Sequence, residues 1–148
     1  MKVSKNCGVS TNQGCLSNKG EYNIDGTLED NSLDTRNGYK IILSDGTSVY
    51  LNSSAICIDI DGPNKGNNTR GYDLFWFTIK NNIVVPYSRP ESFVEYLMYG
   101  SNDSSITGDG RSASAWIIDY DNMDYLKLGK DGKCPNGTTP TEQNPRCK

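Results

Sequence analysis

The stretch from Tyr39 to Leu51, with the sequence YKIILSDGTSVYL, decides the fold class of this chain. It contains two short apolar runs, 39–43 and 48–51, rich in the β-branched and aromatic side chains that favour strands. Between them lies Asp45-Gly46, a dipeptide that supplies the positive φ angles of a tight hairpin turn. The stretch therefore predicts an antiparallel β-hairpin at the start of a sheet core that spans residues 39–128.

Further strands are predicted after the hairpin. Residues 55–60 are apolar and β-branched, and residues 73–79 form the most aromatic run of the chain. Asn81-Asn82 is a turn signal that leads into a short strand at 83–85. The apolar run Ala115 to Ile118 is predicted to be one more strand.

Two helical segments are expected beside this sheet. Residues 90–99 have apolar side chains at helical spacing and a glycine at position 100, which predicts a short amphipathic helix. Met1 to Lys5 are interpreted as the last turn of a helix that ends near Gly8. The pattern as a whole indicates a single β-rich domain covering residues 1–148.

The composition excludes several classes of function. The chain has 148 residues, of which 34% are hydrophobic, and its 15 glycines fit a thin β-rich domain with long polar loops. It contains no histidine, which excludes a Ser-His-Asp triad, a Cys-His pair and histidine-ligated metal sites. The net charge of -3 argues against nonspecific nucleic-acid binding by the whole domain, because such binding needs a basic surface. No apolar run approaches the roughly 20 residues of a membrane-spanning helix.

The five cysteines form two close pairs and one isolated residue. Cys7 with Cys15, and Cys134 with Cys147, lie in polar, glycine-rich surroundings that are typical of exposed loops. Neither pair has the CxxC spacing of a zinc site, so we favour two disulfides over a metal site or free thiols. Paired, exposed cysteines indicate an oxidising compartment. Cys57 lies in the apolar run AICI, which predicts a small buried core residue.

Two groups of acidic and amide residues are candidates for binding calcium, since oxygen ligands on alternating residues can converge on a hard cation. The first group is Asp59, Asp61, Asn64 and Asp73, and the second is Asp119, Asp121 and Asp124. Neither follows the EF-hand pattern, because the loop glycine and the closing glutamate are missing or misplaced. We favour turn-forming roles and predict no cofactor, with calcium at the first group as the alternative.

The sequence offers no marked catalytic residue. Glu91 with Glu95, and Asp59 with Asp61, have the residue type that glycosidases use, but solvated or turn-stabilising roles are favoured. No serine lies in a GxSxG motif. The aromatic residues near the strand 73–79 are interpreted as core and sheet face, and not as a sugar-binding platform; they are Tyr72, Phe75, Trp76 and Phe77. We therefore predict that the chain is not an enzyme.

Three segments together carry a resemblance to a known family. MKVSKNC at 1–7, with GC at 14–15, looks like the stretch where a long N-terminal helix ends. IILSDGTSVYL at 41–51 and ICIDIDGPNKGNNTRGYDLFWFTI at 56–79 are similar to a hairpin, an acidic turn, a Pro-Asn loop and an aromatic strand. SAWIIDYDNMDYLK at 114–127 resembles a closing strand that contains tryptophan. In this order, the segments resemble type IV pilin-like proteins and type II secretion pseudopilins over most of residues 1–128.

The resemblance implies an α+β head domain in which the end of an N-terminal helix, residues 1–7, packs on an antiparallel sheet of four or more strands. Residues 8–38 would be a loop region, and residues 129–148 a C-terminal loop closed by a disulfide. It also implies a structural subunit, either a major or minor pilin or a pseudopilin, anchored in the bacterial inner membrane before filament assembly. We accordingly expect an export and anchoring segment before Met1. Ala113 stands where many relatives are expected to carry a cysteine, so no partner is expected for Cys57.

The competing class is a secreted β-rich binding module such as an adhesin or lectin, located outside the cell or in the periplasm. For a pilin, the partners would be other filament subunits, and the isolated domain is expected to be monomeric. The tail, residues 127–148, is more basic than the rest of the chain and is a candidate contact for a host surface or DNA. A solvated loop is favoured, with weak, salt-sensitive DNA binding through Lys130 and Lys133 at most.

Overall fold

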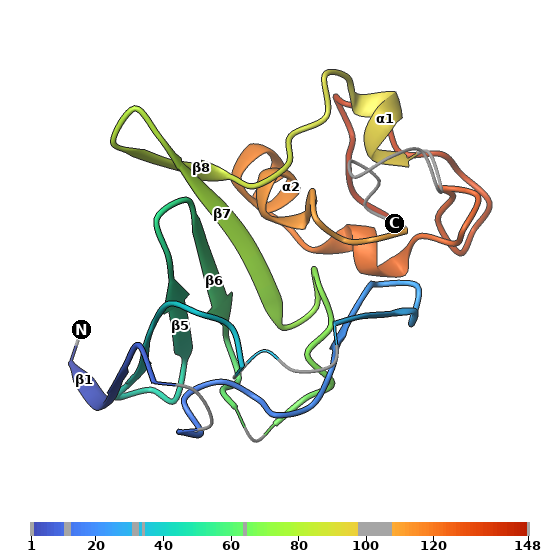
Figure 1. Ribbon diagram of the computed structural model, residues 1–148. Coiled ribbons are helices and arrows are strands. Elements are labelled where there is room, and N and C mark those ends of the chain that lie inside the picture. The colour runs from blue at the N-terminus through green and yellow to red at the C-terminus, as the bar shows by residue number, and fades with distance from the viewer. Residues whose placement is uncertain are drawn as a thin grey trace.

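The computed structural model describes residues 2–10, 13–30, 33, 35–63, 65–97 and 108–147. Its largest element is a six-stranded antiparallel sheet with the order β1-β4-β5-β6-β7-β8. These strands are β1 (Val3–Gly8), β4 (Tyr39–Leu43), β5 (Ser48–Leu51), β6 (Ala55–Asp59), β7 (Leu74–Lys80) and β8 (Ile83–Pro86). A second, small sheet pairs β2 (Glu21–Tyr22) with β3 (Leu28–Asp30). In Figure 1 the large sheet occupies the left of the view, and the helices gather with the C-terminal tail on the right.

The predicted hairpin is confirmed as the pair β4 and β5. Ile41 lies opposite Val49 in the antiparallel register, so the two apolar runs face each other as expected. The turn between them contains Gly46, whose φ of +96° is a conformation that only glycine adopts without strain. The local turn chemistry therefore fixes this register.

Three of the strands predicted after the hairpin, at 55–60, 73–79 and 83–85, are also confirmed. β6 and β7 pair so that Cys57 lies opposite Trp76, and Asp59 lies opposite Leu74. The turn between β7 and β8 is formed by Asn81 and Asn82, with φ angles of +53° and +61°. Consecutive left-handed residues at a two-residue turn match the right-handed twist of the flanking strands, and asparagine tolerates this conformation.

The predicted N-terminal helix end at residues 1–7 is wrong. Val3–Gly8 is an edge strand of the large sheet, paired with β4 so that Val3 lies opposite Leu43. The edge of β4 offers main-chain donors and acceptors with which this segment pairs as a strand. The region 8–38, predicted to be loop, also contains β2 and β3.

The predicted strand at residues 115–118 is wrong as well, because Ala113–Tyr120 forms helix α2. Ala113 and Trp116 are buried while Ile118 is 56% exposed, as expected for a helix that buries one face. An apolar run of four residues is too short to show the periodicity that distinguishes a helix from a strand. The segment after α2 contains a 3-10 helix, Asp124–Lys127.

The amphipathic helix predicted at 90–99 is present as α1 (Phe93–Leu97). Its predicted end near position 100 lies outside the described residues. None of the helices in the described part of the chain is long and apolar enough to cross a membrane.

Strand β7 separates two hydrophobic clusters. Neighbouring strand residues point to opposite faces, so Trp76 joins a cluster within the sheet region and Phe75 joins a cluster under the helices. The first cluster contains Leu16, Leu33, Tyr50, Ala55, Cys57, Leu74 and Trp76. The second contains Phe75, Tyr96, Ala113, Ala115, Trp116 and Tyr125. The first part of the strand is thus covered on both faces, which explains why its first four residues, 74–77, are all apolar.

Both predicted disulfides are confirmed. Cys7 is bonded to Cys15 and Cys134 to Cys147, with Cα–Cα distances of 6.2 Å and 5.4 Å. Cys57 is a free thiol and is 1% exposed, as its apolar setting predicts. The first disulfide anchors β1 to the following loop, and the second closes the C-terminal tail.

Candidate functional site

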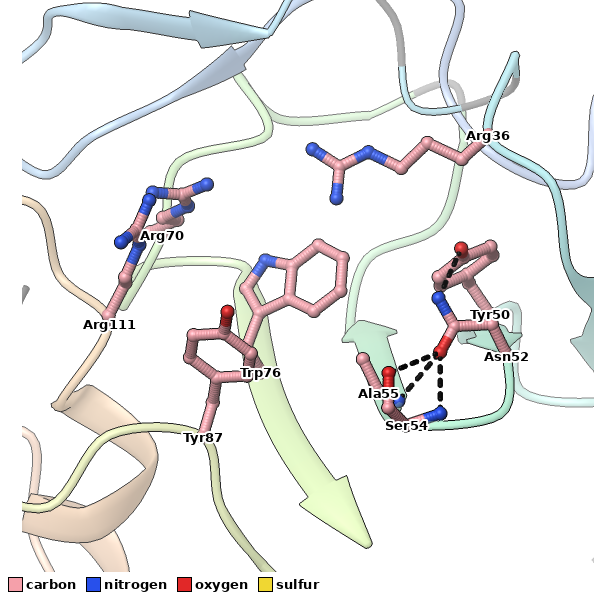
Figure 2. Close-up of a pocket in the computed structure, with 9 residues that line it drawn as sticks. All are labelled: Arg36, Tyr50, Asn52, Ser54, Ala55, Arg70, Trp76, Tyr87 and Arg111. Atoms are coloured by element: carbon pink, nitrogen blue, oxygen red, sulfur yellow. Dashed lines mark hydrogen bonds between the residues drawn. The ribbon is translucent and has the colours of Figure 1, made fainter.

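A cavity of about 250 Å³ lies beside Trp76 on the sheet. Its walls come from segments that are far apart in the sequence, as Figure 2 shows. The lining residues are Arg36, Tyr50, Asn52, Ser54, Ala55, Arg70, Trp76, Tyr87 and Arg111. Three arginines and three aromatic side chains in one small cavity are an arrangement that can bind a polar or planar ligand.

A buried carboxylate organises the arginines. The side chain of Glu21 is fully buried and accepts hydrogen bonds from Arg70 Nε at 2.6 Å and Trp76 Nε1 at 2.7 Å. Arg36 forms a salt bridge to the second carboxylate oxygen of Glu21 at 2.5 Å. Burial by itself would lower the pKa of Arg70, but the Glu21 carboxylate outweighs it and the pKa is raised. The guanidinium therefore stays charged.

A second carboxylate, that of Glu29, pairs with two of the arginines that line the cavity. It contacts Arg111 at 2.7 Å and Arg70 at 3.3 Å. Burial raises the pKa of Glu29, but the two arginines outweigh it and the pKa lies below its ordinary value. Arg111 also faces Asp109 at 3.6 Å. The arginines of the cavity are thus held in place by carboxylates, and their charges are balanced.

Aromatic side chains form the rest of the cavity. The Arg36 guanidinium lies 4.8 Å from the centre of the Trp76 ring, a cation–π contact. Tyr87, which is 46% exposed, packs edge-on against Trp76 with ring centres 6.3 Å apart. On the opposite side, Tyr50 is fixed by a hydrogen bond from Asn52 at 2.9 Å (Figure 2). Tyr87 is therefore the aromatic ring of this cavity that solvent reaches most easily.

The sequence predictions for the aromatic run were largely right and missed this cavity. Phe75 and Trp76 are buried, but Tyr72 is 61% exposed and is not part of the core. The arginines come from three separate segments, and no local spacing relates them. The burial of a single glutamate such as Glu21 also cannot be predicted from a sequence pattern.

The first acidic group is partly assembled by the fold. Asp59, at the end of β6, is 0% exposed and accepts a hydrogen bond from the Gly62 N–H at 2.9 Å. Burial, followed by the neighbouring carboxyl group of Asp61, raises the pKa of Asp59 to about 7. Asp73 also lies close enough to raise it. Asn64, the remaining member of the predicted group, lies outside the described residues.

Asp73 has a separate structural role. Its two carboxylate oxygens accept hydrogen bonds from the main-chain N–H groups of Asn67, Asn68 and Thr69. Burial raises the pKa of Asp73, and these hydrogen bonds oppose the rise. Asp73 thus fixes the loop between β6 and β7. Among the residues that the structure describes, no group of three or more histidine, cysteine, aspartate or glutamate side chains is placed to hold a metal ion.

The other predicted candidates have separate structural contacts. Asp119 pairs with Arg89 at 2.7 Å, Asp121 ends helix α2 with a φ of +50°, and Asp124 pairs with Lys127 at 2.7 Å. These three residues therefore do not form one site.

In the carboxylate pair Glu91 and Glu95, the side chain of one residue is hydrogen-bonded to the main chain of the other. The Glu95 side chain accepts a hydrogen bond from the Glu91 N–H at 2.9 Å, just before helix α1. This contact satisfies a donor near the start of the helix. It gives the pair a stabilising role in the local structure.

Comparison of the chain with protein-family models, curated proteins and solved structures finds no match.

Proposed function

We propose that this chain is the globular head of a bacterial filament subunit of the type IV pilin or type II secretion pseudopilin class. The observation that carries this proposal is that two of the three segments with the family resemblance, residues 41–79 and 114–127, pack together at strand β7. The β4–β5 hairpin and β6 precede it in the sheet, and helix α2 packs on it through a hydrogen bond from Ser114 Oγ to the Trp76 carbonyl at 2.6 Å.

The last of the segments with the resemblance, residues 114–127, also contacts the start of β7. The Tyr125 hydroxyl, within the segment 114–127, donates a hydrogen bond to the Gly71 carbonyl at the entry to β7. Two motifs that are distant in the sequence thus form a single packed unit. This supports a common structural module, although the N-terminal segment expected to be helical is a strand.

A structural role also agrees with the chemistry of the chain. It has no histidine, and the acidic pairs singled out in the sequence have structural partners or lie in a loop. The disulfides suit assembly outside the inner membrane. In this proposal the subunit is anchored in the inner membrane before assembly, and its partners are other filament subunits.

The gene and the cell surface test this proposal together. We expect the codons before Met1 to encode about 20 or more apolar residues. An antibody against the head should detect the protein in filaments sheared from the cells, and deletion of the apolar segment should remove it from that fraction. A gene that encodes a cleaved signal peptide in place of the apolar segment, with the protein free in the medium, would overturn the proposal.

The cavity beside Trp76 favours a second candidate function, a secreted binding module such as an adhesin or lectin. Tyr87 is exposed next to Trp76, as in sites where sugars stack on aromatic rings. The test is a glycan array probed with the wild-type chain, Tyr87→Ala and Tyr72→Ala. Binding that is lost in Tyr87→Ala and kept in Tyr72→Ala, an exposed tyrosine outside the cavity, supports this candidate. Absence of any bound glycan contradicts it.

A further inference from the structure

Three buried polar atoms without hydrogen-bond partners cluster where β5 and β6 meet the Asp59 loop. Among the residues that the structure describes, Ser48 Oγ, Asp59 Oδ2 and Asp61 Oδ1 are all buried and find no partner. Ser48 and Asp59 are each 0% exposed and lie directly opposite each other in the β5–β6 register. Cross-strand partners project from the same face of a sheet, so these two side chains share one location.

Such a cluster has an energetic cost that must be offset. A buried polar atom without a partner loses its hydration and gains nothing in return, and native structures contain few of them. The cost is greater here because the carboxyl groups of Asp59 and Asp61 are neighbours of like charge. Either a cation or a proton shared by the two groups has to balance them.

The main chain of Gly66 approaches the carboxylates closely. Asp73 Oδ2 and Asp61 Oδ2 lie 2.3 Å and 2.5 Å from the point where a Cβ on Gly66 would stand. A side chain at position 66 would therefore collide with these oxygens. Gly62 is equally confined, because its Cβ would lie 2.3 Å from the Gly46 carbonyl oxygen of the β4–β5 turn. Both glycines also have positive φ angles, which other residues adopt only with strain.

We propose that the chain binds one Ca²⁺ ion at Asp59 and Asp61, where the end of β6 meets Gly62. Both oxygens of Asp73 already accept main-chain hydrogen bonds, so the described side chains offer two open carboxylates. Ca²⁺ accepts hydroxyl, main-chain carbonyl and water oxygens as its remaining ligands in flexible geometry, whereas Mg²⁺ demands a near-ideal octahedron and Zn²⁺ is usually held by histidine and cysteine. Ser48 Oγ, on the cross-strand partner of Asp59, is a hydroxyl candidate among the unpartnered atoms. A site with two carboxylates is expected to have the modest affinity of extracellular calcium modules, on the order of 10⁻⁴ to 10⁻³ M.

Equilibrium dialysis of the whole chain against ⁴⁵Ca²⁺ tests this proposal directly and needs no variant. After treatment with EGTA, the wild-type protein should bind one ion, with half-saturation on the order of 10⁻⁴ to 10⁻³ M. The same addition should raise its melting temperature, and Mg²⁺ at equal concentration should raise it much less. Absence of bound Ca²⁺ at about 5 mM, above this affinity range, would overturn the proposal and leave a shared proton as the balancing group.

Matched variants locate the ion. Asp59→Asn and Asp61→Asn keep the side-chain shape and should weaken binding by at least roughly tenfold, because each removes a charged ligand. Asp121→Asn, at an exposed helix end, is the control and should bind as the wild type does. Asp61 is only half-buried, so its variant should fold even if Asp59→Asn does not. Equal binding by Asp61→Asn and the wild type would overturn the assignment of this site.

Discussion

Arg70 Nε lies 2.6 Å from Glu21 Oε1, and the two side chains are 6% and 0% exposed. Glu21 belongs to the small sheet and Arg70 to the loop that leads into β7. The backbone joins the same elements, since the Tyr22 N–H donates to the Asn68 carbonyl and the Arg70 N–H to the Tyr22 carbonyl. This ion pair therefore connects the N-terminal region to the sheet and shapes the cavity beside Trp76.

We expect Glu21→Ala to lower the free energy of unfolding by about 3–5 kcal/mol, because it leaves the buried Arg70 charge without its closest carboxylate partner. Urea denaturation followed by tryptophan fluorescence measures this change. Glu91→Ala removes an exposed carboxylate and should stay within about 0.5 kcal/mol of the wild type. Equal stability of the two variants would show that the Glu21 pair does not hold the fold together.

The helix cluster predicts a second large effect. Trp116 is 0% exposed and contacts the rings of Phe93, Tyr96, Tyr120 and Tyr125. Trp116→Ala should cost about 3–5 kcal/mol of unfolding free energy, through lost burial and the cavity left behind. Ile118→Ala, on the exposed side of the same helix, is the control and should change stability little. The reverse order would mean that α2 is misplaced or is a strand.

Thiol labelling checks the covalent structure. Alkylation of the denatured but unreduced protein should modify one cysteine, Cys57, and mass spectrometry should find the other four blocked. Replacing Cys134 and Cys147 together with serine should reduce stability by about 3 kcal/mol on the chain-entropy model. Labelling of all five cysteines without reductant would contradict both disulfides.

The buried tyrosines predict a sensitivity to alkaline pH. Burial raises the pKa of Tyr125 above its ordinary value of 10.0. The folded state therefore holds this proton more tightly than the unfolded state does, so stability is intact below pH 10 and falls as the pH rises above it. The loss should approach about 1.4 kcal/mol per pH unit for this group.

Tyr125→Phe should be less stable than the wild type near pH 7, because the Gly71 carbonyl loses its donor, by about 1–2 kcal/mol. Above pH 10 its unfolding free energy should fall less steeply. Denaturation midpoints at several pH values measure both effects. Tyr72→Phe, at an exposed position, should follow the wild type, and identical slopes for all three proteins would contradict the role of Tyr125.

Local chemistry allowed several features to be predicted from the sequence. The β4–β5 hairpin follows from Asp45-Gly46, because a tight turn depends on the φ angles of a few adjacent residues. The two disulfides join cysteines that are 8 and 13 residues apart, so proximity along the chain was enough to pair them. Asp59 and Asp61 were singled out as candidates because alternate residues of a strand share a face.

Only the tertiary structure decided the remaining features. Residues 3–8 became a strand because the edge of β4 was available to pair with them, and residues 113–120 became a helix because one side packs on β7. The cavity beside Trp76 needs Arg36, Arg70 and Arg111 from three separate segments. Their positions depend on the buried carboxylates of Glu21 and Glu29, and the energy of such ion pairs depends on burial, which spacing along the sequence does not encode.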